Sequence, residues 1–141
     1  MISTRGRYAI RVLIDLAEHR GEVFTPMKEV AKRQEISLKY LEKIMPLLSK
    51  AGLVEGQHGK GGGYRLTREP ESYRIGDILR LTEVDLAPVA CLSAPVNTCQ
   101  RAAYCRTLPM WQKYYEMTLD YFDSITIRDL MQQESGGDYV I

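Results

Sequence analysis

Three cysteines lie close together in the second half of the chain, in the pattern Cys91-x7-Cys99-x5-Cys105. Thiolates are the usual ligands of 2Fe–2S and 4Fe–4S clusters, and three suffice when a fourth group comes from elsewhere. A thiol switch needs only two cysteines, one of them an exposed thiolate of low pKa. The residues alone leave four interpretations open: an iron–sulfur cluster, a redox-active thiol, a zinc site, or three unrelated cysteines.

Zinc binding and enzymatic chemistry find less support in the rest of the chain. Structural zinc sites take four nitrogen or sulfur ligands, and neither His19 nor His58 lies in the cysteine loop. The sequence contains no Ser/His/Asp arrangement, zinc-protease motif or dinucleotide fingerprint. Its glycine-rich stretch at 59–63 lacks the Lys-Ser/Thr ending of a P-loop. We therefore expect a binding protein, because an enzyme would require the cysteines themselves to be catalytic.

Charge is distributed unevenly between the two halves of the chain. Residues 1–80 carry 15 Lys/Arg and 10 Asp/Glu, a net charge of +5, whereas residues 81–141 carry 4 and 8, a net charge of −4. A basic first half beside an acidic second half favours nucleic-acid binding by the first half. A chance fluctuation of a few charges would give the same numbers. The charge distribution alone therefore does not establish nucleic-acid binding.

Two short helices joined by a brief turn are predicted between residues 25 and 50. Thr25 is the expected cap of the first, with Pro26 at its first helical position and an end near Gln34. Ser37 is the expected cap of the second, an amphipathic helix that ends before Gly52. Such a pair is typical of a helix-turn-helix, whose second helix enters the major groove of double-stranded DNA.

A two-stranded hairpin, or wing, is predicted directly after these helices. The strand-like segments 53–55 and 64–66 flank a glycine-rich tip, where the backbone can approach a phosphate closely. DNA contacts are therefore predicted from the start of the second helix and from this tip. The predicted contact residues are Ser37, Lys39, Tyr40, Glu42, Lys43, His58, Gly59, Lys60 and Gly61.

A long helix with a wide aromatic face is predicted from Leu108 to about Phe122. On it Trp111, Tyr115, Leu119 and Phe122 recur at i, i+4, i+8 and i+11, which places them on one face. Such a face usually needs a partner, and a second copy of the chain is the simplest one. We therefore predict a homodimer through these four residues.

No apolar run approaches the ~20 residues needed to span a membrane, and no apolar core follows a basic start as in a secretory signal. A cytoplasmic protein is therefore expected. In that compartment a cysteine is more often a ligand, a redox sensor or a buried small residue than half of a structural disulfide.

Several motifs spread along the chain jointly carry a family resemblance. They are Gly6-Arg7-Tyr8-Ala9, Ile36-Ser37-Leu38-x-Tyr40-Leu41-Glu42, Ala51-Gly52-Leu53-Val54, Gly61-Gly62-Gly63-Tyr64-x-Leu66 and Ile125-Thr-Ile-x-Asp-Leu130. With them, residues 1–133 resemble the Rrf-two family of bacterial winged-helix transcription regulators. The resemblance implies a mainly α fold with a small β wing and operator binding as a homodimer. The family includes both cluster-binding and cluster-free regulators, so the resemblance alone leaves the cofactor open.

The resemblance also implies a division of the chain. Residues 1–83 would form the winged helix-turn-helix domain, 84–106 the cysteine-containing sensor loop, 107–133 the dimerisation helix with a closing short helix capped by Thr126, and 134–141 a loose tail. A change of ligation in the loop would then shift the relative setting of the two recognition helices.

The cysteine loop resembles the three-cysteine cluster motif of the family but departs from it twice. Its first spacing is two residues longer than the usual five, which a loop tolerates at low entropic cost. The fourth cluster ligand in members of the family is a histidine at the position of Leu108 or an aspartate at that of Tyr8. With the resemblance included, an iron–sulfur cluster is favoured, its fourth position held by a weak group. A cluster-free regulator that uses a thiol switch, an effector or a partner protein is the alternative.

Overall fold

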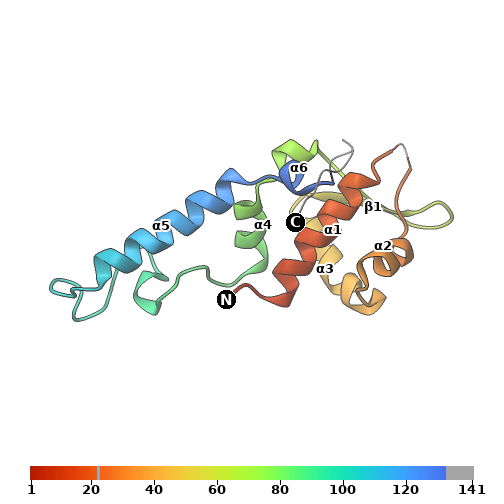
Figure 1. Cartoon of the computed structure of the whole chain (residues 1–141). Coiled ribbons are helices and arrows are strands. Elements are labelled where there is room, and N and C mark those ends of the chain that lie inside the picture. The colour runs from red at the N-terminus through yellow and green to blue at the C-terminus, as the bar shows by residue number, and fades with distance from the viewer. Residues whose placement is uncertain (22, 133–141) are drawn as a thin grey trace.

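The computed structural model describes residues 1–21 and 23–132, and the predicted tail at 134–141 lies outside the described residues. Helices and a hairpin form a body, from which one long helix projects (Figure 1). The elements in chain order are α1 (Thr4–Glu18), α2 (Met27–Gln34), α3 (Leu38–Lys50), β1 (Val54–Gln57), β2 (Gly63–Leu66), the 3-10 turn η1 (Pro70–Ser72), α4 (Ile75–Thr82), the 3-10 turn η2 (Ala90–Leu92), α5 (Leu108–Ser124) and α6 (Ile127–Leu130). The predicted fold class, mainly α with a small β wing, is confirmed.

The helix α1 forms because a side-chain cap and an apolar stripe coincide in its sequence. The hydroxyl of Ser3 accepts a hydrogen bond from the backbone N–H of Gly6 at 3.0 Å, which satisfies one of the otherwise unpaired amides of the first turn. One face of the helix is buried throughout: Ala9, Val12, Leu13, Leu16 and Ala17. This face is the centre on which the other helices of the body pack.

The prediction that Thr25 caps the next helix is wrong. Pro26 is the N-cap residue of α2 and Met27 its first residue. Thr25 instead exchanges two backbone hydrogen bonds with Tyr64 of β2, both at 2.9 Å. Because the backbone of Thr25 is paired with the wing, the segment before α2 adds a short third strand position to the hairpin.

The second helix of the pair follows its sequence signals closely. The hydroxyl of Ser37 accepts a hydrogen bond from the backbone N–H of Tyr40 at 3.1 Å and so caps α3 as predicted. Leu41, Ile44, Met45 and Leu48 are buried on its inner side. The opposite side of α3 carries exposed polar and charged residues, among them Lys39, Glu42 and Lys43.

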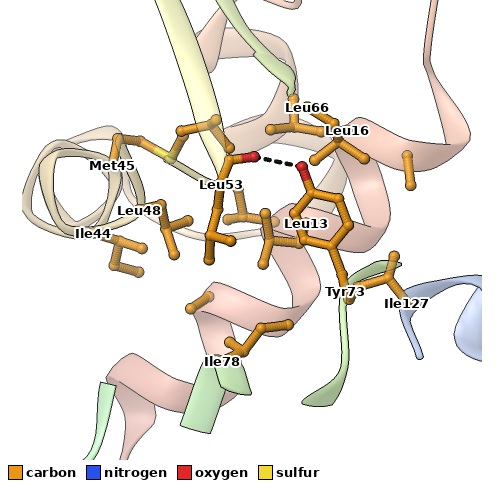
Figure 2. Close-up of a cluster of buried hydrophobic side chains, with 14 of the residues drawn as sticks. Leu13, Leu16, Ile44, Met45, Leu48, Leu53, Leu66, Tyr73, Ile78 and Ile127 are labelled. Carbon is orange, nitrogen blue, oxygen red and sulfur yellow. Dashed lines mark hydrogen bonds between the residues drawn. The ribbon is translucent and has the colours of Figure 1, made fainter. Parts of the chain in front are cut away.

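The base of the wing is fixed to the body by a buried tyrosine. The hydroxyl of Tyr73 donates to the carbonyl of Leu53 at 2.6 Å (Figure 2). It accepts hydrogen bonds from the backbone N–H groups of Thr67 and Arg68 at 3.1 and 3.2 Å. The strands pair antiparallel with Val54 opposite Leu66. The direction in which the wing leaves the body is therefore set by the core.

After α5 the chain returns to the body. The backbone N–H of Ile75 donates to the carbonyl of Ile125 at 2.8 Å, and that of Ile127 donates to Tyr73 at 2.9 Å. Thr126 caps α6 as predicted, in a reciprocal capping box with Asp129. Ile127 is fully buried in the core that Figure 2 shows. The chain after α5 is thus tied to the body, whereas α5 itself has no buried residue.

Candidate DNA interface and cysteine loop

The first two turns of α3 present the residues predicted to contact DNA. Ser37, Lys39, Glu42 and Lys43 are exposed, and Tyr40 is half-buried. N-terminal residues of a recognition helix are the ones that reach base edges. The position of these side chains on the outer face therefore suits groove binding.

The Tyr40 ring is packed against a second tyrosine from α1. The rings of Tyr8 and Tyr40 lie 5.4 Å apart, centroid to centroid, at an interplanar angle of 77°. The guanidinium of Arg11 lies over the Tyr8 ring, 5.1 Å from its centroid. The sequence offered no signal for this contact, since Tyr8 and Tyr40 belong to different helices.

Arg11 is held in turn by the end of α2. It donates to the side-chain and backbone oxygens of Gln34, whose amide donates to Asp15 at 2.9 Å. Asp15 is buried and also accepts two hydrogen bonds from Arg33, at 3.0 and 2.7 Å. Buried carboxylates require such partners. This network joins α1 to the carboxy-terminal end of α2, close in sequence to the turn that precedes α3.

An open cleft of about 450 Å³ separates the start of α1 from the outer face of α3. It is lined by Ser3, Thr4, Arg5, Tyr40, Lys43 and Ile44. Arg5 does not reach freely into this cleft, because its Nε donates to the carbonyl of Thr82 at 3.0 Å and Nη2 donates to the same oxygen. Lys43 is an exposed cation on the recognition-helix side of the cleft.

Glu83, the residue directly after α4, holds the start of α1. Its carboxylate accepts hydrogen bonds from the backbone N–H of Ser3 and from the Ser3 hydroxyl, the latter at 2.6 Å. Burial alone would raise the pKa of Glu83, but hydrogen bonds from Ser3 and Thr82, together with the charge of Arg5, lower the pKa below the ordinary value. The cysteine loop begins at residue 84, directly after Glu83. Its first residue is therefore bonded to a residue that holds Ser3, the cap of α1.

The predicted wing residues His58, Gly59, Lys60 and Gly61 are all exposed at the hairpin tip. Gly59 and Gly61 have positive φ angles of 89° and 78°, a conformation that side-chain-bearing residues adopt reluctantly. In Figure 1 the wing lies at the end of the molecule opposite the free end of α5. The tip can thus approach a nucleic acid without interference from α5.

The segment between α4 and α5 runs out to the free end of α5 and carries the three cysteines (Figure 1). All three thiols are free; Cys99 is exposed, whereas Cys91 and Cys105 are half-buried. The hydrogen bond with the Thr107 hydroxyl, at an Sγ–Oγ1 distance of 3.5 Å, lowers the pKa of the Cys105 thiol. Among the described residues, no three Cys, His, Asp or Glu side chains are gathered closely enough to hold a metal ion.

The donor set nevertheless fits an iron–sulfur cluster chemically. Three unpaired thiols lie in one segment, and the Asn97 side-chain Nδ2 is a buried donor without a hydrogen-bond partner in the described structure. Its Oδ1 accepts the backbone N–H of Cys99 at 2.9 Å. Cluster and thiolate sulfurs accept N–H hydrogen bonds. The residues thus supply ligands and a spare donor, while cluster binding would require the three sulfurs to move together.

Two apolar stripes run along α5. The predicted interface residues Trp111, Tyr115, Leu119 and Phe122 are half-buried, and Phe122 packs against the core of its own chain. A neighbouring stripe is far more open: Met110, Tyr114, Met117 and Tyr121 are 54% to 63% exposed. The spacing of these four residues, i, i+4, i+7 and i+11, also lines one helix face. Sequence reasoning missed this second stripe because both faces have apolar periodicity.

The fold and the exposed recognition helix define a winged helix-turn-helix protein. Residues 2–133 match the family model described as "Rrf2: Iron-dependent Transcriptional regulator". The chain therefore belongs to the Rrf2 family, the Rrf-two family that its motifs resemble. Protein rrf2 of Nitratidesulfovibrio vulgaris (strain Hildenborough) is 37% identical over 134 residues, which cover 95% of this chain and 89% of that protein.

Solved structures of the same family superpose on most of the chain. CymR of B. subtilis, described as the global cysteine regulator, has 34% identity and a TM-score of 0.76, covering 92% of this chain and 95% of that one. IscR of T. potens has 35% identity and a TM-score of 0.73, covering 92% and 85%. This protein is thus a transcriptional regulator of the Rrf2 family and not an enzyme. Within the described residues no helix is long and apolar enough to cross a membrane.

Proposed function

We propose that this protein is a cytoplasmic regulator that binds double-stranded operator DNA as a homodimer and responds to redox, iron–sulfur or nitric-oxide status through a cluster on Cys91, Cys99 and Cys105. The observation that carries the proposal is the position of the cysteine loop. The loop follows directly on Glu83, which holds the capping residue of α1, and α1 lines one cleft with the recognition helix.

DNA binding is assigned to the start of α3 and to the wing tip. Lys39 and Lys43 on the helix and Lys60 on the wing are exposed cations that suit phosphate oxygens. Contacts with base edges are assigned to Tyr40 and Glu42 at the start of the same helix. Two copies related by a two-fold axis would read half-sites about one helical turn, or a multiple of it, apart. The operator is therefore expected to be a palindrome or near-palindrome.

Dimerisation is assigned to α5. Its open stripe of Met110, Tyr114, Met117 and Tyr121 is contiguous and apolar, and a second copy of the same helix can cover it isologously. The half-buried residues Trp111, Tyr115, Leu119 and Phe122 remain part of the proposed interface at its edge. Both stripes together give the wide face that the sequence indicates.

The cluster is assigned to the three cysteine thiolates, with the Asn97 amide as a donor to sulfur. When bound, such a cluster supplies iron that reacts with oxygen, nitric oxide or other oxidants. Leu108 is the first residue of α5 and has no ligating atom, and Tyr8 is packed against Tyr40. The fourth position is therefore assigned to a weak group, either a carboxylate from α5 or from the partner, water, or a small thiol.

The route from loop to DNA is assigned to the end of α4. A shift of the loop pulls on Glu83 and hence on Ser3, and it moves Thr82, whose carbonyl accepts from Arg5. These contacts hold the amino-terminal turn of α1 against the cleft that Tyr40 and Lys43 line. The loop thereby biases the setting of the recognition helix.

Iron and acid-labile sulfide content, with the visible absorption spectrum of protein purified without oxygen, test the cluster assignment. We expect a brown, oxygen-labile protein, and loss of the chromophore in each of the Cys91→Ala, Cys99→Ala and Cys105→Ala variants. A Ser93→Ala variant in the same loop is the matched control and should keep the colour. Colourless protein after anaerobic reconstitution with iron and sulfide would refute the cluster.

A thiol switch on the same fold is the second candidate function. It is favoured by the exposure of Cys99, by the lowered pKa of Cys105, and by similarity to CymR, described as a cysteine regulator. In that case iron-free protein would change its operator affinity after treatment with a mild thiol oxidant. Reversal by dithiothreitol and loss of the response in a Cys105→Ala variant would identify this function.

A further inference from the structure

The contact between Tyr8 and Tyr40 joins the helix that supports the fold to the helix proposed to read DNA. Tyr40 is the third residue of α3, and its backbone N–H is already fixed by the Ser37 hydroxyl. The remaining freedom is that of the ring. The edge of one tyrosine meets the face of the other at 5.4 Å and 77°, a favourable arrangement of aromatic quadrupoles.

Tyr8 is itself in contact with Arg11 of the same helix. The Arg11 guanidinium lies 5.1 Å from the Tyr8 ring centroid. Its Nε donates to the side-chain oxygen of Gln34 and its Nη2 donates to the backbone oxygen of the same residue, which fixes the orientation of the guanidinium. Gln34 is anchored to Asp15, a carboxylate that is only 1% exposed. A continuous set of contacts therefore runs from the buried carboxylate of Asp15 to the Tyr40 ring.

We propose that Tyr8, backed by Arg11, is a positioning residue that holds the Tyr40 ring in its DNA-reading orientation. This inference rests on the proposed function, since it presupposes DNA binding by α3. A ring that is fixed before binding loses less rotamer freedom in the complex, so preorganisation raises affinity for the correct sequence. Tyr8 acts through Tyr40 and not through a phosphate, so the salt dependence of binding stays the same when Tyr8 is changed.

The test uses the full chain and the duplex that the wild-type protein enriches from a random-sequence library. Tyr8→Leu removes the ring, and we expect operator affinity to fall about threefold to tenfold, with the salt slope and the affinity for random-sequence duplex unchanged. Tyr8→Phe keeps the ring and should bind as the wild type does. In a Tyr40→Leu background, the further change Tyr8→Leu should have no effect.

Three outcomes would overturn the inference: an unchanged operator affinity of Tyr8→Leu, an equal loss in the Tyr40→Leu background, or a loss in Tyr8→Phe as large as in Tyr8→Leu. Should Tyr8→Leu fail to fold, Arg11→Lys replaces it, because lysine keeps the charge and loses the fork to Gln34. That variant should lose about twofold to fivefold in operator affinity, and wild-type affinity would overturn the inference. Failure of the wild-type protein to enrich any duplex would instead refute the proposed function.

Discussion

Arg80 of α4 donates two hydrogen bonds to the carboxylate of Asp123 near the end of α5, from Nη1 to Oδ1 at 2.7 Å and from Nη2 to Oδ2 at 2.9 Å. The pair raises the pKa of Arg80 and lowers that of Asp123. Gly76 makes this approach possible, because a Cβ atom at that position would overlap the Asp123 carboxylate. This ion pair thus helps to fix the carboxy-terminal end of α5 to α4.

The first prediction is that Arg80 and Asp123 are energetically coupled. Bidentate geometry places the pair at the upper end of surface ion pairs, so a double-mutant cycle of Arg80→Ala and Asp123→Ala should give about 0.5 to 1 kcal/mol of coupling in the free energy of unfolding. Urea denaturation measures it. The longer Arg128–Glu71 pair at 3.8 Å, exposed on both sides, is the matched control and should give less. Additive effects at Arg80 and Asp123 would contradict the prediction.

The second prediction concerns acid stability. Because the folded-state pKa of Asp123 is lower than its ordinary value, the stabilisation is present above the unfolded-state pKa of about 3.9. It is lost as pH falls through the lower folded-state pKa. The melting temperature of Asp123→Asn should therefore lie below that of the wild type at pH 6, and the two should converge as the pH falls below the folded-state pKa of Asp123. A gap that stays constant across this range would exclude titration of Asp123 as its cause.

The third prediction separates the two faces of α5. Met117→Glu with Tyr121→Glu should give folded monomers, because these side chains are exposed and contact the second copy in the proposed dimer. Phe122→Glu should lower stability as well, since Phe122 packs on the core of its own chain. Gln112→Glu, an exposed change on the same helix, is the control. Sedimentation showing an intact dimer in the Met117/Tyr121 variant would exclude this stripe from the interface.

The fourth prediction concerns the wing. Removing the side chains of His58 and Lys60 by alanine substitution should lower DNA affinity with little change in sequence preference if they contact only phosphates. Gly62→Val should lower it through geometry, because a Cβ there would overlap the backbone oxygen of Gln57. Lys50→Ala, at the far end of α3, is the matched control. Full affinity in both wing variants would place the wing outside the interface.

The fifth prediction concerns phosphate contacts of the recognition helix. Lys39→Ala or Lys43→Ala should weaken binding to all duplexes alike and reduce the slope of log affinity against log salt by about one. Filter binding or fluorescence anisotropy at several salt concentrations measures the slope. An unchanged slope in both variants would mean that neither lysine contacts phosphate.

Local signals made much of the fold predictable from sequence. The caps Ser37 and Thr126 act within one helical turn, and the α1 stripe repeats at helical spacing, so both are visible in the sequence. The prediction of Thr25 as a helix cap fails because its backbone pairs with Tyr64. Tyr64 lies far along the chain, so no signal near Thr25 in the sequence indicates this pairing.

Candidate site residues can be proposed from the sequence, but the contacts that position them cannot. Ser3 and Glu83 are 80 residues apart in sequence, and Tyr8 meets Tyr40 across two helices, so neither contact has a local signature. The choice between two apolar faces of α5 depends on which one the rest of the chain covers. Cysteine spacing, likewise, indicates candidate thiolate ligands but does not predict whether the loop brings their sulfur atoms together.

Operator affinity measured with and without the cluster decides whether this protein is a cluster-dependent regulator. Protein reconstituted anaerobically with iron and sulfide, and the same sample after removal of iron by a chelator, are titrated against the duplex selected from the random-sequence library. We expect the dissociation constant to change about tenfold or more, and not to change in a Cys91→Ala variant given the same two treatments. Equal affinity of the two wild-type samples would contradict a cluster-dependent regulator.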